Sequence, residues 1–541
     1  MYRTVRGKEP YLTAAEADRA VDVLIEAQSV PRHADLVAAF LMQADIAGGL
    51  WFYPGGTHTR AIIGRLVDRP DVSIRGIVDR GPAAPCADLN LPVVTPEAVA
   101  AALLPGDRIV VSHQSLEAPL IDALRAAGVA PDRIVGIYSD PSYRRFYDEQ
   151  GQLRRLLGNL PIEIGRIRHV ILRVTNPVVI DDSALATAFP PAETLVIGAA
   201  RLGAPTTSRV YPTINLYGQL SLLPALLDTL NPATLYYQGN FEGFFHYNIL
   251  RRSSVRPKLI FEMWDSWCIG LDYMSTKELS NCFKYPEEFI RLEQSEESNL
   301  YRDAAVTVTK RGGTWPALFD HPMGETLEYF VHINNPDSPP SNRRPTEPGL
   351  AKRVVFASSV AVPSGLEGFP GMKINHDHLS MIERLTALEA AQFHIFNGND
   401  IGALDNPYVP VAQRCANLGI GYSQRQPIDR LREMLVDFDY GWVRAMPANR
   451  TRDHDAVIPA TFSTYLMVGL PVIIHECLIH AVDLVREFDA GIIVSSETPE
   501  EVAALIRTAD PERHRRGASA LQAWMYERNQ QTLAQLKARF G

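Results

Sequence analysis

The chain has 541 residues, of which 46% are hydrophobic and 21% charged, a composition typical of a folded protein with two to four domains. Its formal net charge of −9 argues against a general nucleic-acid-binding protein. No run of eighteen apolar residues occurs and the N-terminus has no apolar signal core, so we expect neither a membrane-spanning helix nor a secretory signal. Five scattered cysteines predict reduced thiols in a cytoplasmic protein.

The first part of the chain predicts helices followed by a small α/β domain. Residues 1–47 are expected to be helical, with Ala- and Leu-rich stretches at 14–27 and 34–44. Strands are expected at 50–53, 74–79, 91–94 and 108–112, and helices at 60–67 and 96–104. Because strands and helices alternate, this part predicts a parallel sheet within a first domain of residues 1–155.

The turn after the first strand contains Gly55, Gly56 and Thr57, and the second strand ends at Asp79. This pattern resembles small Rossmann-like domains that accompany sugar-modifying enzymes, but the fingerprint Gly-x-Gly-x-x-Gly is absent. Two interpretations stay open. The residues contact a ligand, or the glycines shape a turn and Asp79 caps a loop, and we favour the second.

Two further α/β blocks follow, predicted as domains over residues 166–340 and 350–541. The second block has short β-rich segments at 169–174, 194–198, 234–237, 258–262 and 305–309. A Pro-, Ser- and Asn-rich stretch at 334–348 reads as a linker. The third block has strands expected at 353–357, 393–397, 419–422, 440–443 and 492–494, a helix at 499–509, and one or two helices in the tail 511–540.

The most informative segment is residues 459–474, PATFSTYLMVGLPVII. Pro459 suits the first turn of a helix and Gly469 suits the left-handed residue that ends one, so a short helix should lead directly into a buried strand. Free N–H groups and the dipole at a helix start favour an anion such as a diphosphate. Thr461, Ser463 and Thr464 add hydroxyl groups to the first turns.

This segment resembles the donor-site motif of GT-B glycosyltransferases of the GT4 and GT1 kind. The matching positions, in register and without a gap, are Pro459, Tyr465, Leu466, Gly469, Pro471, Val472 and Ile473. Thr461 stands where the family has a lysine, and Thr464 where it has a ribose-binding glutamate. Segments 353–357, 421–431, 436–442 and 490–494 resemble other parts of the same family domain in the same order.

The resemblance implies a fold and a donor site. The fold is a GT-B pair of Rossmann-like domains, here preceded by a third Rossmann-like α/β domain. The implied donor-binding residues are Ser358, Tyr422, Arg425, Pro459, Thr461, Ser463 and Thr464. Tyr422 would lie by the base and Thr464 by the ribose. No Asp-x-Asp pair lies in the matching loops, so we expect no metal, and leaving-group charge would be met by helix N–H groups and by Arg425, Arg444 or Arg450.

The second block should supply the acceptor side. Asp265 aligns with an acid that the family often carries at the cleft, with Trp264 in place of a histidine. In an inverting enzyme Asp265 would be the general base, and in a retaining one it would orient sugar hydroxyls. A structural cap is the alternative. Trp264 and Trp267 are candidate acceptor contacts, as are Asn240 and Glu242, although core packing is equally compatible with the tryptophans.

Two motifs that suggest metal binding are rejected. His475 and His480 are five residues apart, whereas the zinc-protease motif needs four. His376 and His378 provide only two ligands.

The sequence therefore predicts a metal-independent glycosyltransferase of the hexosyltransferase type, located in the cytoplasm or at the inner face of the membrane. Its donor would be a nucleotide sugar and its acceptor a cell-surface glycan, a lipid-linked glycan or a protein. Two alternatives remain: a non-catalytic GT-B-like scaffold that binds nucleotides or glycans, and a sugar-nucleotide-modifying enzyme that acts through the first domain.

Overall fold

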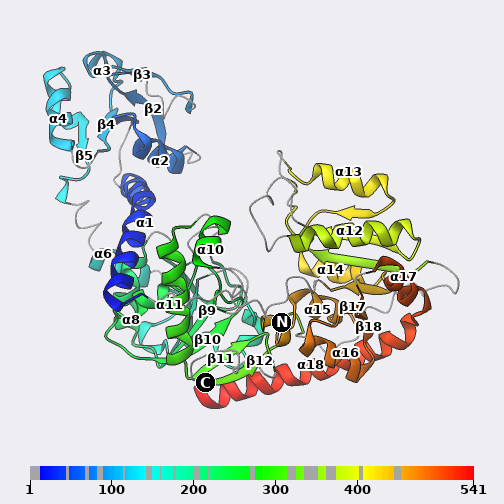
Figure 1. Ribbon diagram of the computed structural model, residues 1–541. Coiled ribbons are helices and arrows are strands. Elements are labelled where there is room, and N and C mark those ends of the chain that lie inside the picture. The colour runs from blue at the N-terminus through cyan, green and yellow to red at the C-terminus, as the bar shows by residue number, and fades with distance from the viewer. Residues whose placement is uncertain are drawn as a thin grey trace.

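The computed structural model contains three parallel α/β units along the chain (Figure 1). It describes residues 12–43, 48–67, 72–81, 89–113, 116–141, 149–158, 160–174, 178–199, 206–216, 219–268, 275–283, 285–312, 324–333, 351–360, 373–400, 402, 406–443, 452–496 and 498–541. Among these residues, no helix combines the length and apolar content that crossing a bilayer would require. The predicted linker 334–348 lies outside the described residues.

The first unit is a five-stranded sheet in the order β3-β2-β1-β4-β5. Its strands are β1 (Gly49–Tyr53), β2 (Ser73–Val78), β3 (Val93–Val94), β4 (Arg108–Val111) and β5 (Ile134–Gly136). Its helices are α2 (Thr57–Leu66), α3 (Pro96–Ala102) and α4 (Glu117–Ala126). Every residue of β1 is buried, as expected for a parallel strand covered on both faces.

The second unit is a seven-stranded sheet in the order β12-β11-β10-β9-β6-β7-β8. The strands are β6 (His169–Arg173), β7 (Thr194–Gly198), β8 (Thr213–Asn215), β9 (Thr234–Gly239), β10 (Lys258–Met263), β11 (Val306–Thr309) and β12 (Glu325–Glu328). Around it lie α6 (Glu149–Gly158), α7 (Asp182–Leu185), α8 (Leu223–Leu230), α9 (His246–Leu250), α10 (Thr276–Phe283) and α11 (Glu287–Asp303).

The third unit is a six-stranded sheet in the order β15-β14-β13-β16-β17-β18. The strands are β13 (Arg353–Ser358), β14 (Gln392–Asn397), β15 (Gly421–Ser423), β16 (Tyr440–Trp442), β17 (Val472–His475) and β18 (Gly491–Val494). The helices are α12 (Lys373–Ala387), α13 (Val409–Asn417), α14 (Ile428–Leu435), α15 (Ala460–Leu466), α16 (Ile479–Phe488), α17 (Pro499–Thr508) and α18 (Pro511–Phe540).

The predicted alternation of strands and helices is confirmed in all three units. Sequence reasoning missed β5, β8 and β12. Each lies at the edge of its sheet and is three or four residues long. An edge strand has one neighbour and less apolar surface to bury, so its sequence carries a weaker hydrophobic pattern.

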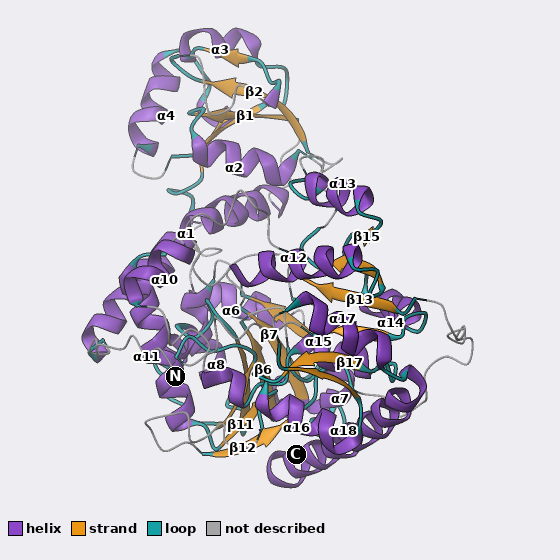
Figure 2. Ribbon diagram, turned by 45° about the vertical axis from the view of Figure 1, so that its right-hand side comes forward, coloured by secondary structure: helices purple, strands orange, loops and turns teal. Residues whose placement is uncertain are grey.

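The N-terminal segment forms one continuous helix, α1 (Ala14–Gln43), where the sequence suggested two separate stretches. Its first half packs on the second unit, where Val21 joins the core and Asp18 accepts a hydrogen bond from Asn248 Nδ2 (3.0 Å). Its second half packs on the first unit through residues such as Val37. In Figures 1 and 2 the first unit accordingly stands apart from the other two, at the far end of α1.

The tail forms a single helix, α18, which crosses from the third unit to the second (Figures 1 and 2). Met525 packs in the core of the third unit and Leu536 in that of the second. Between them lies Asn529, which is fully buried. Its Oδ1 accepts a hydrogen bond from Phe330 N (2.8 Å), and its Nδ2 donates to the carbonyl oxygens of Phe330 and Ile333 (both 2.9 Å).

We predict that Asn529→Ala lowers the free energy of unfolding by roughly 2–4 kcal/mol, because it removes three hydrogen bonds to buried backbone groups of Phe330 and Ile333. Gln530→Ala, at an exposed neighbouring position of α18, is the matched control. Denaturant unfolding of both variants measures the difference. Equal stability would show that this tether between the second unit and α18 contributes little.

Candidate active site

The predicted site residues follow strands of the second and third sheets at their carboxyl edges. In parallel sheets, ligands bind beyond these edges at the point where the strand order reverses. The reversal falls between β6 and β9 in the second sheet, and between β13 and β16 in the third. The positions of the side chains around these two points decide which of the predicted site residues can contribute to one site.

The helix of the 459–474 motif is α15, and Tyr465 anchors it at the reversal point of the third sheet. The Tyr465 hydroxyl accepts a hydrogen bond from Ala357 N of β13 (2.8 Å) and donates one to Trp442 O of β16 (3.1 Å). Its ring lies against Gly441, where an added Cβ atom would come within 2.3 Å of the ring. One tyrosine therefore ties α15 to both strands that flank the reversal.

The start of α15 is as predicted, with Pro459 directly before the first helical residue. Pro459 and Thr461 are half-buried, whereas the side chains of Ser463 and Thr464 are 1% and 7% exposed. Thr464 donates its hydroxyl to Ala460 O (2.8 Å), so only its lone pairs remain for a ribose. Pro459 and Thr461 thus offer the more accessible surface, and the donor-binding roles of all four residues stay predictions.

Tyr422, the predicted base contact, is half-buried in a polar cluster. Its hydroxyl donates to Asp400 Oδ2 (2.9 Å) and accepts from Asn397 Nδ2 (3.0 Å). Burial raises the pKa of Tyr422 well above its ordinary value, so it is a neutral donor. Arg425 is exposed, and its backbone N–H donates to Asp400 O (2.8 Å). Ser358 ends β13 half-buried, at the same carboxyl edge.

A short antiparallel pairing joins the second unit to the start of α15. Arg311 and Val457 form a β-bridge, and Ile458 N donates to Lys310 O (3.0 Å). Lys310 directly follows β11, and Ile458 directly precedes Pro459. The carboxyl edge of the second sheet and the predicted donor helix are therefore held in contact.

Asp265 lies in a charged cluster beside this pairing. Its Oδ1 is 3.0 Å from Lys310 Nζ and 3.9 Å from a guanidinium nitrogen of Arg311. Lys310 Nζ lies 4.4 Å from the centre of the Trp264 ring, and Arg311 donates to Trp264 O (3.0 Å). Burial alone would raise the pKa of Asp265, but the charges of Lys310 and Arg311 outweigh it and lower the pKa. Asp265 is thus an ionised carboxylate in an ion pair.

The loop after β9 is fixed by a buried carboxyl group, Glu293 of α11. Glu293 accepts hydrogen bonds from Phe245 N (2.8 Å), Phe244 N (3.3 Å) and Trp267 Nε1 (3.1 Å). Its burial raises its pKa to about 8. Trp267 is fully buried and packs against Phe241, with ring centres 4.7 Å apart. The predicted acceptor residue Trp267 is therefore placed in the core, where it shapes the loop.

The loop after β10, which carries Asp265, is fixed by Glu297 in the same way. Glu297 is fully buried and accepts hydrogen bonds from Trp267 N (2.9 Å), Cys268 N (3.1 Å) and the Ser266 hydroxyl (2.5 Å). Burial raises the pKa of Glu297, although these bonds oppose the shift. The loop that carries Asp265 is thus held by Glu297 of α11, through hydrogen bonds to the three residues that follow Asp265.

A third buried carboxyl group, Glu262 of β10, fixes the loop after β6. It accepts hydrogen bonds from Val179 N (2.6 Å), Ile180 N (3.3 Å) and the Tyr236 hydroxyl (2.8 Å). Burial raises the pKa of Glu262 to about 7.

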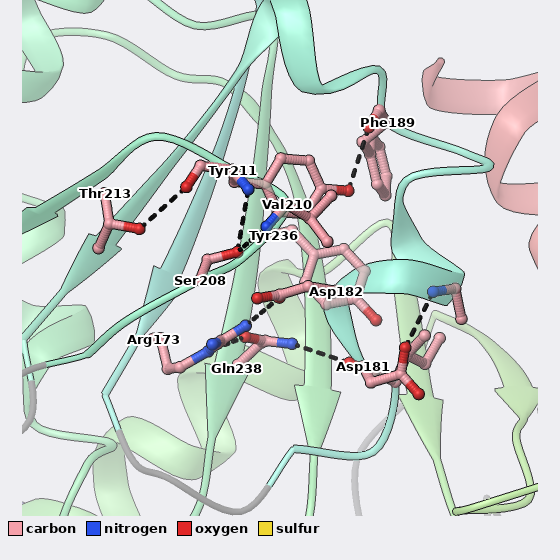
Figure 3. Close-up of polar contacts among 12 residues, drawn as sticks. Arg173, Asp181, Asp182, Phe189, Ser208, Val210, Tyr211, Thr213, Tyr236 and Gln238 are labelled. Atoms are coloured by element: carbon pink, nitrogen blue, oxygen red, sulfur yellow. Dashed lines mark hydrogen bonds and ion pairs between the residues drawn. The ribbon is translucent and has the colours of Figure 1, made fainter. Parts of the chain in front are cut away.

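Arg173 of β6 lies on the same face of the sheet as Glu262, with Gln238 of β9 between them. Figure 3 shows the contacts of Arg173. Arg173 donates to Gln238 Oε1 (2.8 Å) and to Asp182 Oδ1 (2.5 Å). The same view shows the Tyr211 hydroxyl donating to Phe189 O (3.1 Å). Asp182 balances the charge of Arg173. Arg173 therefore has a structural role, next to the loop that follows β6.

The other predicted acceptor residues lie at the end of β9. Asn240 is half-buried, and its Oδ1 is a buried atom without a hydrogen-bond partner among the described residues. Glu242 is half-buried with a left-handed backbone at φ 69°. Both stay candidate acceptor contacts, as does the half-buried Trp264.

In the first unit, Asp79 accepts hydrogen bonds from Gly55 N (2.8 Å) and Gly81 N (3.1 Å). Its carboxylate therefore caps the turn, which is the interpretation that the sequence favoured. His475 and His480 lie in β17 and α16, and His480 Nε2 is 2.7 Å from Glu328 Oε1, so they form no zinc-protease helix. No group of three or more potential metal ligands occurs within the part of the chain that the structure describes.

Sequence reasoning missed Lys310, Arg311 and the buried glutamates. A lysine and an arginine after a strand do not by themselves indicate a functional site. Their place beside the donor helix depends on the pairing with Val457 and Ile458, which the sequence does not reveal. The sequence of α11, EEFIRLEQSEESNLYRD, reads as a solvated charged helix. The i, i+4 spacing of Glu293 and Glu297 on an apolar face was the available sign. Two residues that were predicted to meet leaving-group charge, Arg444 and Arg450, lie outside the described residues.

No protein-family model and no curated protein sequence matches the chain. Several solved structures do. HepE of Anabaena, in complex with UDP and glucose, is 14% identical with a TM-score of 0.43, over 69% of this chain and 98% of HepE. The lipopolysaccharide outer core galactosyltransferase WaaB is 10% identical with a TM-score of 0.41, over 68% and 98%. MurG of Acinetobacter baumannii is 9% identical with a TM-score of 0.36, over 69% and 99%.

The strand orders agree with the sequence-based expectation at the level of architecture. The second and third units are two parallel α/β sheets in tandem, and the first unit is the predicted additional parallel α/β domain.

We predict that Glu293→Gln flattens the pH dependence of stability. With a folded pKa of about 8 against an ordinary value of 4.5, the carboxyl group contributes stability below pH 4.5 that is lost as the pH rises to 8. The free energy of unfolding of the wild type should fall over this window, by up to about 1.4 kcal/mol per pH unit for this group. Urea unfolding at pH 5 to 8 measures it. Glu288→Gln, at an exposed position of α11, should keep the wild-type slope, and a Glu293→Gln slope equal to wild type would contradict the shift.

Proposed function

We propose that the chain is a metal-independent glycosyltransferase that moves a hexosyl group from a nucleotide sugar to a glycan acceptor. One observation carries the proposal. The pairing of Arg311 with Val457 brings the start of α15, the predicted donor side, next to Asp265, the predicted acceptor side. The two halves of the site come from different units and different parts of the sequence, and they meet at the carboxyl edges of both sheets.

The proposed reaction, for an inverting enzyme, is a direct displacement. The acceptor oxygen would attack the anomeric carbon of the donor while the bond from that carbon to the diphosphate breaks. Asp265 would take the acceptor proton, and the nucleoside diphosphate would leave with its charge near Pro459 and Thr461. If the reaction retains configuration, Asp265 instead orients sugar hydroxyls. We expect the acceptor to be a cell-surface glycan, a lipid-linked glycan or a protein, met in the cytoplasm or at the inner face of the membrane.

A non-catalytic nucleotide- or glycan-binding scaffold is the second candidate. The two threonines at the lysine and glutamate positions of the motif favour this candidate. The Thr464 hydroxyl already donates its hydrogen bond to Ala460 O within α15, so it cannot donate one to a ribose. An enzyme acting through the first unit is less favoured, because the Asp79 carboxylate already accepts hydrogen bonds from Gly55 N and Gly81 N.

The test is nucleotide release from UDP-, GDP-, dTDP- and CMP-sugars with acceptor extracts present. We expect release with one donor class, unchanged by a chelator, and a rise in melting temperature with the same donor. Asp265→Asn should lower release by roughly 10²- to 10⁴-fold if Asp265 is the general base. Asp122→Asn, on an exposed helix of the first unit, is the control. Donor binding without release would favour the scaffold, and silence in both assays would contradict both GT-B proposals.

A further inference from the structure

We propose that Lys310 binds the diphosphate of the donor and that Asp265 holds this lysine until the donor arrives. The inference rests on the proposed function and assigns a donor contact to the second unit, where the family motif places none. The predicted donor helix has Thr461 and Thr464 where the family motif has a lysine and a glutamate. Lys310 would supply the positive charge that this helix lacks.

The position of Lys310 is set by its backbone. Lys310 O accepts from Ile458 N (3.0 Å), so the two residues are cross-strand neighbours, and Ile458 directly precedes Pro459 at the start of α15. Opposed residues of an antiparallel pairing have Cα atoms about 5 Å apart. A lysine stem of four methylene groups can therefore carry an ammonium group to a phosphate beside Pro459.

The side-chain environment holds Lys310 in place. Its side chain is only 7% exposed, and Nζ lies 3.0 Å from Asp265 Oδ1 and 4.4 Å from the centre of the Trp264 ring. Arg311, 1% exposed, adds a second positive charge 3.9 Å from Asp265. Asp265 therefore faces two cationic side chains.

This arrangement couples the two substrates. A bound diphosphate would compete with Asp265 for the ammonium group of Lys310. Once Lys310 turns to the phosphate oxygens, Asp265 loses its closest cation and becomes a better proton acceptor for the second substrate. The Asp265 carboxylate should therefore weaken the binding of the diphosphate by competing for Lys310. A purely structural ion pair would not affect diphosphate affinity in this way.

The experiment measures the affinity of the full chain for UDP, or for whichever nucleoside diphosphate the donor screen selects, and for the corresponding nucleoside. Lys310→Met should weaken diphosphate binding roughly tenfold or more, since a charge-assisted contact is lost, and leave nucleoside binding unchanged. Lys310→Arg should restore most of the affinity. Asp265→Asn should tighten diphosphate binding, because the competing carboxylate is gone.

Lys258→Met, at the exposed amino end of β10, is the matched control, and thermal unfolding checks that each variant is folded. Equal diphosphate affinity in wild type and Lys310→Met would overturn the inference, and so would weaker binding by Asp265→Asn. If the wild type bound no nucleotide at all, the proposed function itself would fail, which is a distinguishable result.

Discussion

The arrangement of the candidate site depends on one backbone contact, the antiparallel pairing of Arg311 with Val457. Within the described part of the chain, the second and third sheets are also connected by α18 and by the contact of His480 with Glu328. The pairing fixes where α15 begins relative to β11, and so places Pro459 beside Lys310 and Asp265. Tyr465 completes the constraint on the other side, since its hydroxyl bonds α15 to β13 and β16 at once.

A second constraint recurs in the second unit, where three loops at the carboxyl edge of the sheet are held by buried glutamates. Glu262 holds the loop after β6, Glu293 the loop after β9 and Glu297 the loop after β10. Burying a carboxyl group costs free energy unless hydrogen bonds compensate, and each of these accepts at least three. The loops of the predicted acceptor side are thus anchored to buried side chains, as the positioning of two substrates would require.

Most of the fold could be predicted from the sequence, and less of the site. Interior parallel strands such as β7 are continuous apolar runs, so they were found, whereas the short edge strands β8 and β12 were not. The Pro459 and Gly469 signals correctly bounded the helix-to-strand segment because each residue has one dominant local preference. Burial of Ser463 and Trp267 and the partners of Asp265 depend on contacts between distant segments, which no local pattern encodes.

We propose that the donor binds where α15 meets the second sheet. Hydrogen exchange of the full chain with and without the selected nucleotide sugar tests it most directly. We expect slowed exchange in two separate segments, residues 456–466 and 306–312, and unchanged exchange in residues 49–60 of the first unit. Slowed exchange confined to residues 49–60 and 73–81, or no change in 456–466, would contradict it.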